Sequence, residues 1–89
     1  MYTIKIHKKA VKFLKSRTPL EKKIIREKLE YLKENPFVHP QLDIKKMKGE
    51  DNLLRLRIGR IRILYKVVEG ELLILVISAG ARGDVYKKK

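Results

Sequence analysis

Apolar and polar residues alternate with two different periods along the chain, and the first period is helical. Apolar side chains recur at intervals of three and four from Ile6 to Leu14 and again from Leu20 to Leu32, as in helices that bury one face. Before them, residues 2–6 alternate and predict a strand. The pattern therefore predicts a strand followed by two amphipathic helices.

The start of the second helix is marked in the sequence. Thr18 can cap a helix, Pro19 suits its first turn, and Glu21 completes a capping box. Asn35-Pro36 ends the helical pattern. Because only one or two residues separate the two predicted helices, we expect them to form an antiparallel hairpin.

From residue 42 onward the period changes to two, which is typical of strands. Leu42 and Ile44 indicate a short strand, and three longer strands follow at about residues 53–58, 61–68 and 71–78. The last strand is apolar on both faces, which favours a central place in the sheet. We therefore expect an α+β fold: a twisted antiparallel β-sheet in β-α-α-β-β-β order, with an N-terminal two-helix hairpin packed on one face.

Two predicted turns set the register of these strands. Gly59-Arg60 has the form of a two-residue hairpin turn with glycine first, which puts Arg57 directly opposite Arg62. Like charges in that arrangement destabilise a hairpin by about a few tenths of a kcal/mol, whereas two guanidinium groups can surround one phosphate. The alternative is an ordinary solvated strand face, on which arginine is common. The cations that share this face are Arg55, Arg57, Arg62 and Lys66.

The second predicted turn, at Glu69-Gly70, concerns the carboxy-terminal segment. It would bring Gly80 level with the Gly59 turn, with Arg82 just beyond it and Tyr86 four residues later. A chain reversal at residues 80–83 would then return Arg82 and Tyr86 towards the arginine face.

The net charge is the strongest signal in the composition. The chain has 89 residues and carries 23 Lys and Arg against 10 Asp and Glu, a formal charge of +13. Such a surplus favours a polyanionic or acidic partner, and nucleic acid first, although lysine can also serve solubility alone. The length predicts a single domain over residues 1–89. The absence of cysteine, of a signal-like amino terminus and of a membrane-length apolar run predicts a cytoplasmic protein.

The chain offers few residues for conventional proton transfer or metal binding. Its two histidines, His7 and His39, border the first helix and lie in a loop between prolines, away from the arginines. We therefore expect them to have capping or loop roles. No acidic pair has ligand spacing and no glycine-rich phosphate loop occurs, so we expect neither a metal nor another cofactor.

Two segments resemble those of a known family. Residues 54–65, with an arginine, a glycine turn and an arginine followed by aliphatic residues and tyrosine, resemble the central hairpin of the RelE/ParE toxin superfamily. Residues 77–86 resemble its carboxy-terminal strand and motif, and the helical hairpin also agrees. The resemblance implies a toxin of a type II toxin–antitoxin pair. RelE-type members cleave mRNA in the ribosomal A site and so inhibit translation, and ParE-type members act on DNA gyrase.

The resemblance to RelE-type toxins also implies roles for individual residues. Arg62 would contact the scissile phosphate, Arg82 would act at the leaving group, and Tyr86 would act on the attacking 2′-hydroxyl. Arg55 aligns with one of two family lysines, and Leu53 aligns with the other, so this chain lacks one family cation. The residues expected to bind RNA around this catalytic set are Arg55, Arg57, Arg60 and Lys66.

The same resemblance implies partners. These are an acidic RelB-like antitoxin that wraps the toxin, the ribosome with its mRNA, and operator DNA only through the antitoxin, with no membrane. A ParE-like gyrase toxin of the same fold and a non-catalytic basic module that binds RNA or DNA remain alternatives. A pure binder does not need Arg82 with Tyr86, although Tyr86 could simply pack on the sheet edge.

Overall fold

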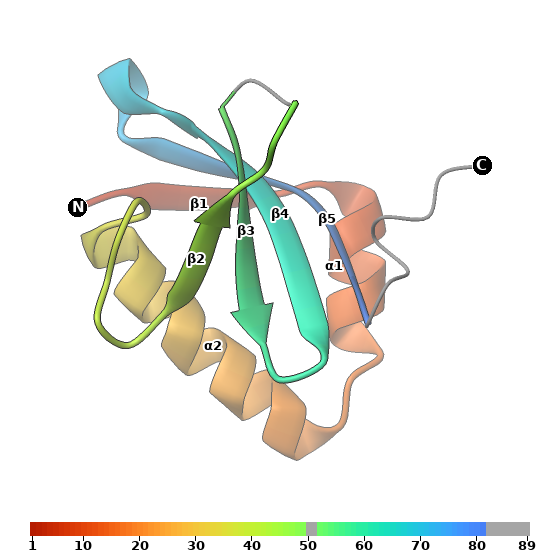
Figure 1. The fold of residues 1–89 in the computed structure, drawn as a ribbon. Helices are drawn as coiled ribbons and strands as arrows, with labels where there is room; N and C mark the ends of the chain where they lie inside the picture. Colours follow the sequence, from red (N-terminus) through yellow and green to blue (C-terminus); the bar gives the residue numbers. More distant parts are fainter. Residues whose placement is uncertain (50–51, 82–89) are drawn as a thin grey trace.

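The structure is a computed structural model that describes residues 1–49 and 52–81. A strand, two helices and four further strands follow one another along the chain (Figure 1). The elements are β1 (Thr3–Ile6), α1 (Lys8–Lys15), α2 (Pro19–Glu34), β2 (Asp43–Lys46), β3 (Leu53–Ile58), β4 (Ile61–Val68), the short 3-10 helix η1 (Glu69–Glu71) and β5 (Leu73–Ala81). Among the described residues, no helix is both long and apolar enough to cross a membrane.

The five strands form one sheet in the order β1-β5-β4-β3-β2. The α+β class is confirmed, and β5 lies in the sheet interior as its apolar run predicts. The sheet is mixed, however, because β1 runs parallel to β5. The short strand indicated by Leu42 and Ile44 is present as β2, so four strands follow the helices, one more than in the expected β-α-α-β-β-β order. The prediction of an antiparallel sheet was wrong at this edge, since alternation fixes which face a residue occupies and says nothing about strand direction.

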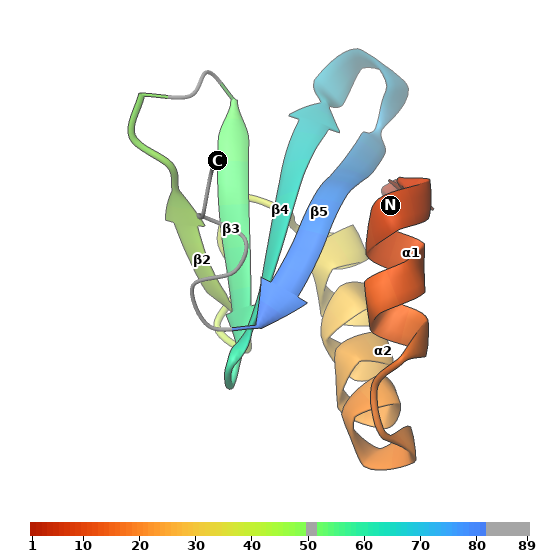
Figure 2. The same cartoon turned by 90° about the vertical axis from the view of Figure 1, so that its right-hand side faces the viewer.

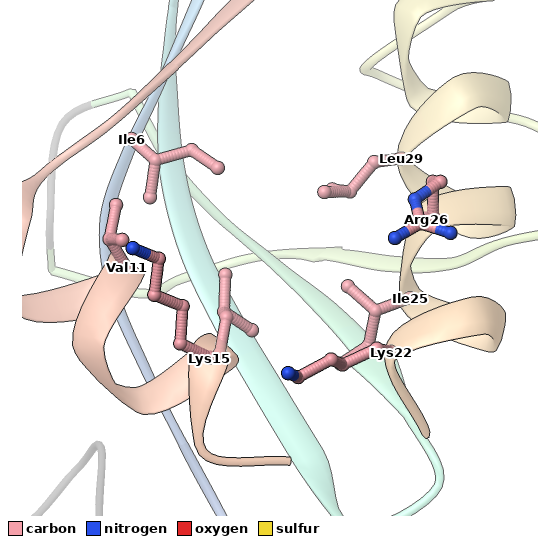
Figure 3. A pocket seen from close by; sticks show the side chains of 8 residues that line it. Ile6, Val11, Lys15, Lys22, Ile25, Arg26 and Leu29 are labelled. Carbon is pink, nitrogen blue, oxygen red and sulfur yellow. The ribbon is translucent and has the colours of Figure 1, made fainter. Parts of the chain in front are cut away.

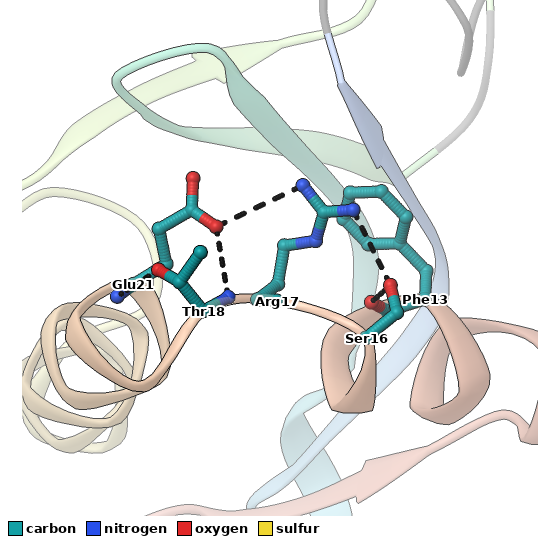
Figure 4. Close-up of polar contacts among 5 residues, drawn as sticks. All are labelled: Phe13, Ser16, Arg17, Thr18 and Glu21. Atoms are coloured by element: carbon teal, nitrogen blue, oxygen red, sulfur yellow. Dashed lines mark hydrogen bonds and ion pairs between the residues drawn. The ribbon is translucent and has the colours of Figure 1, made fainter.

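Both helices cover the same face of the sheet (Figure 2). Thr18 and Glu21 form the predicted capping box, in which each side chain accepts a hydrogen bond from the other residue's backbone N–H. Three residues connect the helices, one more than expected, and Arg17 among them lies 4.3 Å from the Phe13 ring and 3.8 Å from Glu21 (Figure 4). These contacts hold α1 against the start of α2.

The core lies between the helices and the covered face of the sheet. Ala10 from α1 and Ile25 and Leu32 from α2 are buried against the strands. As the hairpin pattern predicts, one face of β3 and β4 supplies most of the core, through Leu54, Leu56, Ile61, Ile63 and Tyr65. The arginines between them are thereby directed to the opposite face, away from the helices. Leu64 is also buried, but it pairs with Arg55 and interrupts the charged face.

The predicted register of the β3–β4 hairpin is confirmed. Arg57 pairs with Arg62, and Ile58 pairs with Ile61 at the turn. Gly59 has a φ of +60°, a backbone conformation that residues with a Cβ rarely adopt. Glycine is therefore required at this position by the turn itself.

The predicted register of the β4–β5 hairpin was wrong, by two residues next to the connection and by three beyond a bulge. Glu69-Gly70 is part of a longer connection that includes η1, and Leu72 takes the left-handed conformation with a φ of 49°. A bulge between Leu64 and Tyr65 shifts the register further along. As a result, Gly80 lies opposite Arg62, not level with Gly59, and β5 ends at Ala81 opposite Ile61.

Candidate nucleic-acid interface

The face of the sheet opposite the helices carries a row of charged residues across its strands. In one row, Asp43 of β2 pairs with Arg57 of β3, which pairs with Arg62 of β4, and Gly80 of β5 follows. In the next row, Lys45 pairs with Arg55. The cationic face predicted from the hairpin is therefore present, and β2 extends it.

Asp43 binds two of the predicted arginines. Its Oδ1 accepts a hydrogen bond from Nη2 of Arg55 at 3.1 Å, and its Oδ2 accepts one from Nε of Arg57 at 3.0 Å. The Arg55 side chain is only 12% exposed, whereas that of Arg57 is 48% exposed. A carboxylate of the protein itself thus offsets part of the like-charge opposition between Arg57 and Arg62.

A cavity of about 540 Å³ lies beside this row, and five of its six lining residues are cationic. We call it the basic pocket; its lining residues are Lys45, Lys46, Met47, Lys48, Arg55 and Arg62. It brings together two of the arginines that the sequence predicts. Fixed positive charge gathered in a concave site attracts phosphate and stabilises charge that develops on it.

The other predicted RNA-binding residues lie elsewhere. Arg57 and Arg60 line a second cavity, of about 410 Å³, between α2 and the Gly59 turn. Lys66 is exposed opposite Leu53, at the far end of the β3–β4 hairpin. Arg82 and Tyr86 lie outside the described residues.

Sequence reasoning missed four functional candidates, all on or next to β2. Asp43 follows Leu42 and precedes Ile44, so the alternation of apolar residues places it on the arginine face. The lysines at 45, 46 and 48 form a run that ends before Gly49. That run was the available signal, but only the pairing of β2 with β3 shows that it meets Arg55.

Tyr65, the last residue of the hairpin motif, is buried on the helix side. Its hydroxyl donates a hydrogen bond of 2.6 Å to the carbonyl oxygen of Pro36. Burial raises the pKa of the Tyr65 phenol well above its usual range. This tyrosine is therefore a structural donor that ties β4 to the segment after α2.

Neither histidine belongs to the arginine face, as predicted. Nδ1 of His7 caps α1 by accepting a hydrogen bond from the backbone N–H of Lys9. His39 lies 2.8 Å from a Glu34 carboxylate oxygen and packs against the Tyr31 ring. Within residues 1–49 and 52–81, no three histidine or acidic side chains gather closely enough to hold a metal ion.

A third cavity, of about 390 Å³, separates the two helices. We call it the helix groove. Ile6 and Val11 face Ile25 and Leu29 across it (Figure 3). Leu14 also lines the groove, and the charged residues around it, Lys15, Lys22 and Arg26, are all cationic. An apolar floor with a basic rim complements an amphipathic segment that carries acidic residues.

Comparison with known proteins agrees with this geometry. A family model described as the ParE toxin of the type II toxin–antitoxin system parDE matches residues 4–86. A Methanocaldococcus jannaschii protein named "Putative toxin RelE1" is 36% identical over 86 residues, which span 97% of this chain and 96% of that protein.

Solved structures share the fold. The archaeal RelE–RelB complex from Pyrococcus horikoshii OT3 contains a chain with a TM-score of 0.80 and 29% identity, covering 93% of this chain and 97% of that one. The RelB–RelE antitoxin–toxin complex from Methanococcus jannaschii gives a TM-score of 0.74 and 30% identity, covering 91% and 93%. The chain therefore belongs to the ParE toxin family of type II toxin–antitoxin systems, within the RelE/ParE superfamily.

Proposed function

We propose that this toxin is a ribosome-dependent endoribonuclease that cleaves mRNA in the A site and so inhibits translation in the cytoplasm. The observation that carries the proposal is the basic pocket, in which Arg55 and Arg62 meet three lysines. Five cations around one cavity suit the phosphates of a single RNA strand. That residues 1–89 act as a single domain stays a prediction.

The chemistry needs no metal in this proposal. The 2′-hydroxyl attacks the adjacent phosphorus, a 2′,3′-cyclic phosphate forms as the bond from phosphorus to the 5′-oxygen breaks, and the leaving oxygen takes a proton from solvent. Arg62 and Arg55 stabilise the negative charge that develops on the phosphate. Tyr86 accepts the 2′-hydroxyl proton and Arg82 stabilises the leaving oxygen, as the family resemblance implies. The ribosome contributes by holding the mRNA in position for the attack.

The test replaces one cation of the basic pocket. We expect Arg62→Ala to lower the rate of mRNA cleavage on translating ribosomes by about 10²-fold, because it removes charge from the reacting phosphate. Primer extension on translated mRNA measures the new 5′ ends. Lys23→Ala is the control, since Lys23 is exposed on α2, lines none of the three cavities and removes the same charge. Equal cleavage by both variants would contradict the role of Arg62.

A second candidate function is poisoning of DNA gyrase. The matching family model bears the name of the ParE toxin, and this observation favours it. A gyrase toxin would arrest growth with DNA breaks while translated mRNA stays intact. Primer extension and a gyrase cleavage assay on the same induced cells therefore separate the two functions.

We further propose that the partner of this toxin is an acidic RelB-like antitoxin, one segment of which occupies the helix groove. The complexes of the two archaeal relatives support the choice of partner. The basic rim and apolar floor of the helix groove support this groove as the site where the antitoxin segment binds. Operator DNA would be reached only through the antitoxin.

Charge reversal at the rim tests this docking site. We expect Lys22→Glu to weaken the complex with an acidic RelB-like antitoxin by about tenfold or more, because it opposes a negatively charged segment. Lys23→Glu makes the same charge change on the next residue, outside the groove. Calorimetric titration of both variants compares their affinities, and an equal loss would argue against the groove.

A further inference from the structure

Asp43 lies between the basic pocket and the cavity beside the Gly59 turn. It lines the cavity beside the Gly59 turn together with Arg57, while its other arginine partner, Arg55, lines the basic pocket. One carboxylate therefore binds one arginine of each cavity. Among the described residues that line the basic pocket, none is acidic, and Asp43 acts on the pocket through its hydrogen bond with Arg55.

We propose that Asp43 is a positioning residue for RNA cleavage. It holds Arg55 in the basic pocket beside Arg62 and keeps Arg57 out of it. The proposal rests on the function proposed above and adds a residue that the family resemblance did not single out.

The geometry supports a positioning role for Asp43 because each of its two carboxylate oxygens binds a different arginine. Oδ1 fixes the terminal nitrogen of Arg55, whose side chain is almost buried, and Oδ2 fixes Nε of the half-exposed Arg57. A long arginine side chain loses much conformational freedom when it is held in one place. A carboxylate that orders it beforehand removes that loss from the chemical step, in which the arginine must meet the charge that develops on the phosphate.

A role for Asp43 in merely neutralising the arginines explains its presence less well than a positioning role does. A negative charge next to a phosphate site weakens the attraction for RNA, so a surface selected only for RNA affinity would lack it. An asparagine of the same shape would remove that penalty, but its single carbonyl oxygen could accept from only one of the two arginines in this geometry. If Asp43 orders the arginines, Asp43→Asn should lower kcat. If Asp43 acts only through its charge, the same substitution should raise RNA affinity and kcat together.

The experiment compares Asp43→Asn with Glu71→Gln, which makes the same charge change at an exposed residue of η1. We expect Asp43→Asn to bind a single-stranded RNA oligonucleotide as tightly as wild type or up to about threefold more tightly, while kcat for mRNA cleavage on ribosomes falls about tenfold. The NMR signal of Arg57 Nε–H should shift and exchange faster with water. Glu71→Gln should leave kcat and this signal unchanged.

Three results would overturn the proposal. In the first, Asp43→Asn behaves like Glu71→Gln in kcat and in the Arg57 signal. In the second, kcat rises with RNA affinity, which would mean that Asp43 only screens charge. In the third, RNA affinity and the urea midpoint fall together with kcat, which would mean a purely structural role. If wild type cleaves no mRNA, the proposed function fails, and the RNA titration and the Arg57 signal still decide whether Asp43 orders the arginines.

Discussion

At the scale of single residues, Tyr65 shows how a motif position can be structural. It follows the aliphatic residues after Arg62, next to the charged site in sequence. The pleat turns it to the opposite face, where it is fully buried and bonded to Pro36. Its proximity to Arg62 in sequence therefore does not place it in the charged site, whereas the alternation along the strand does predict its buried face.

Removing the Tyr65 hydroxyl should reduce stability. We expect Tyr65→Phe to lower the free energy of unfolding by about 1–2 kcal/mol, because the Pro36 carbonyl oxygen would lose its donor in a buried place. Urea denaturation measures the change. Tyr31→Phe is the control, since Tyr31 is partly exposed and its ring, which the substitution keeps, packs against His39. An equal effect of the two substitutions would contradict the account of this hydrogen bond.

The raised pKa of Tyr65 also predicts a pH dependence. In the unfolded chain a tyrosine ionises at about pH 10, whereas burial keeps Tyr65 protonated in the folded protein above that pH. The contribution of Tyr65 to stability is thus complete below pH ~10 and decreases as the pH rises further. The stability gap between wild type and Tyr65→Phe should therefore shrink at alkaline pH, which denaturation at pH 8 and about pH 11 would detect.

At the scale of elements, the two hairpins show what local sequence can determine. The β3–β4 register was predictable because Gly59 demands a positive φ and fixes a two-residue turn. The β4–β5 register was not predictable, because Leu72 and not Gly70 adopts the left-handed conformation. A bulge then adds a shift that alternation does not reveal.

The two turn glycines should respond differently to alanine. A Cβ at Gly59 or Gly70 meets nothing within 4 Å, so space does not distinguish them. We expect Gly59→Ala to cost about 1 kcal/mol, because alanine is strained at a φ of +60°. Gly70→Ala should be neutral or slightly stabilising. Thermal or urea unfolding of both variants measures the difference, and equal costs would contradict the turn assignment.

At the scale of the whole molecule, the positive charge should govern RNA binding through the salt concentration. If the five cations of the basic pocket each neutralise a phosphate, the logarithm of the binding constant for single-stranded RNA should fall with a slope of about 3.5 against the logarithm of salt concentration. The double variant Lys46→Ala/Lys48→Ala should reduce this slope by about 1.4. Lys23→Ala should leave this slope unchanged. If Lys23→Ala reduced the slope as much per charge removed, RNA binding would depend on net charge alone and not on the basic pocket.

The site was predictable from the sequence only in part, because some of its residues are far apart along the chain. Arg55 and Arg62 belong to one hairpin, so a single local turn is enough to place both on one face. Asp43 and Lys45 reach them through the pairing of β2 with β3, across a loop whose course the sequence pattern does not give. Arg82 and Tyr86 lie outside the described residues, and their roles stay predictions.

The position of β2 at the edge of the sheet has a consequence for how the molecule behaves in a crowded solution. An edge strand offers main-chain donors and acceptors to any other strand, and another copy of the same protein is the most abundant candidate. Lys45 and Lys46 lie in this strand, so two copies that met edge to edge would bring their ammonium groups together. The lysines that we propose bind phosphate thereby also protect the edge of the sheet against ordered aggregation.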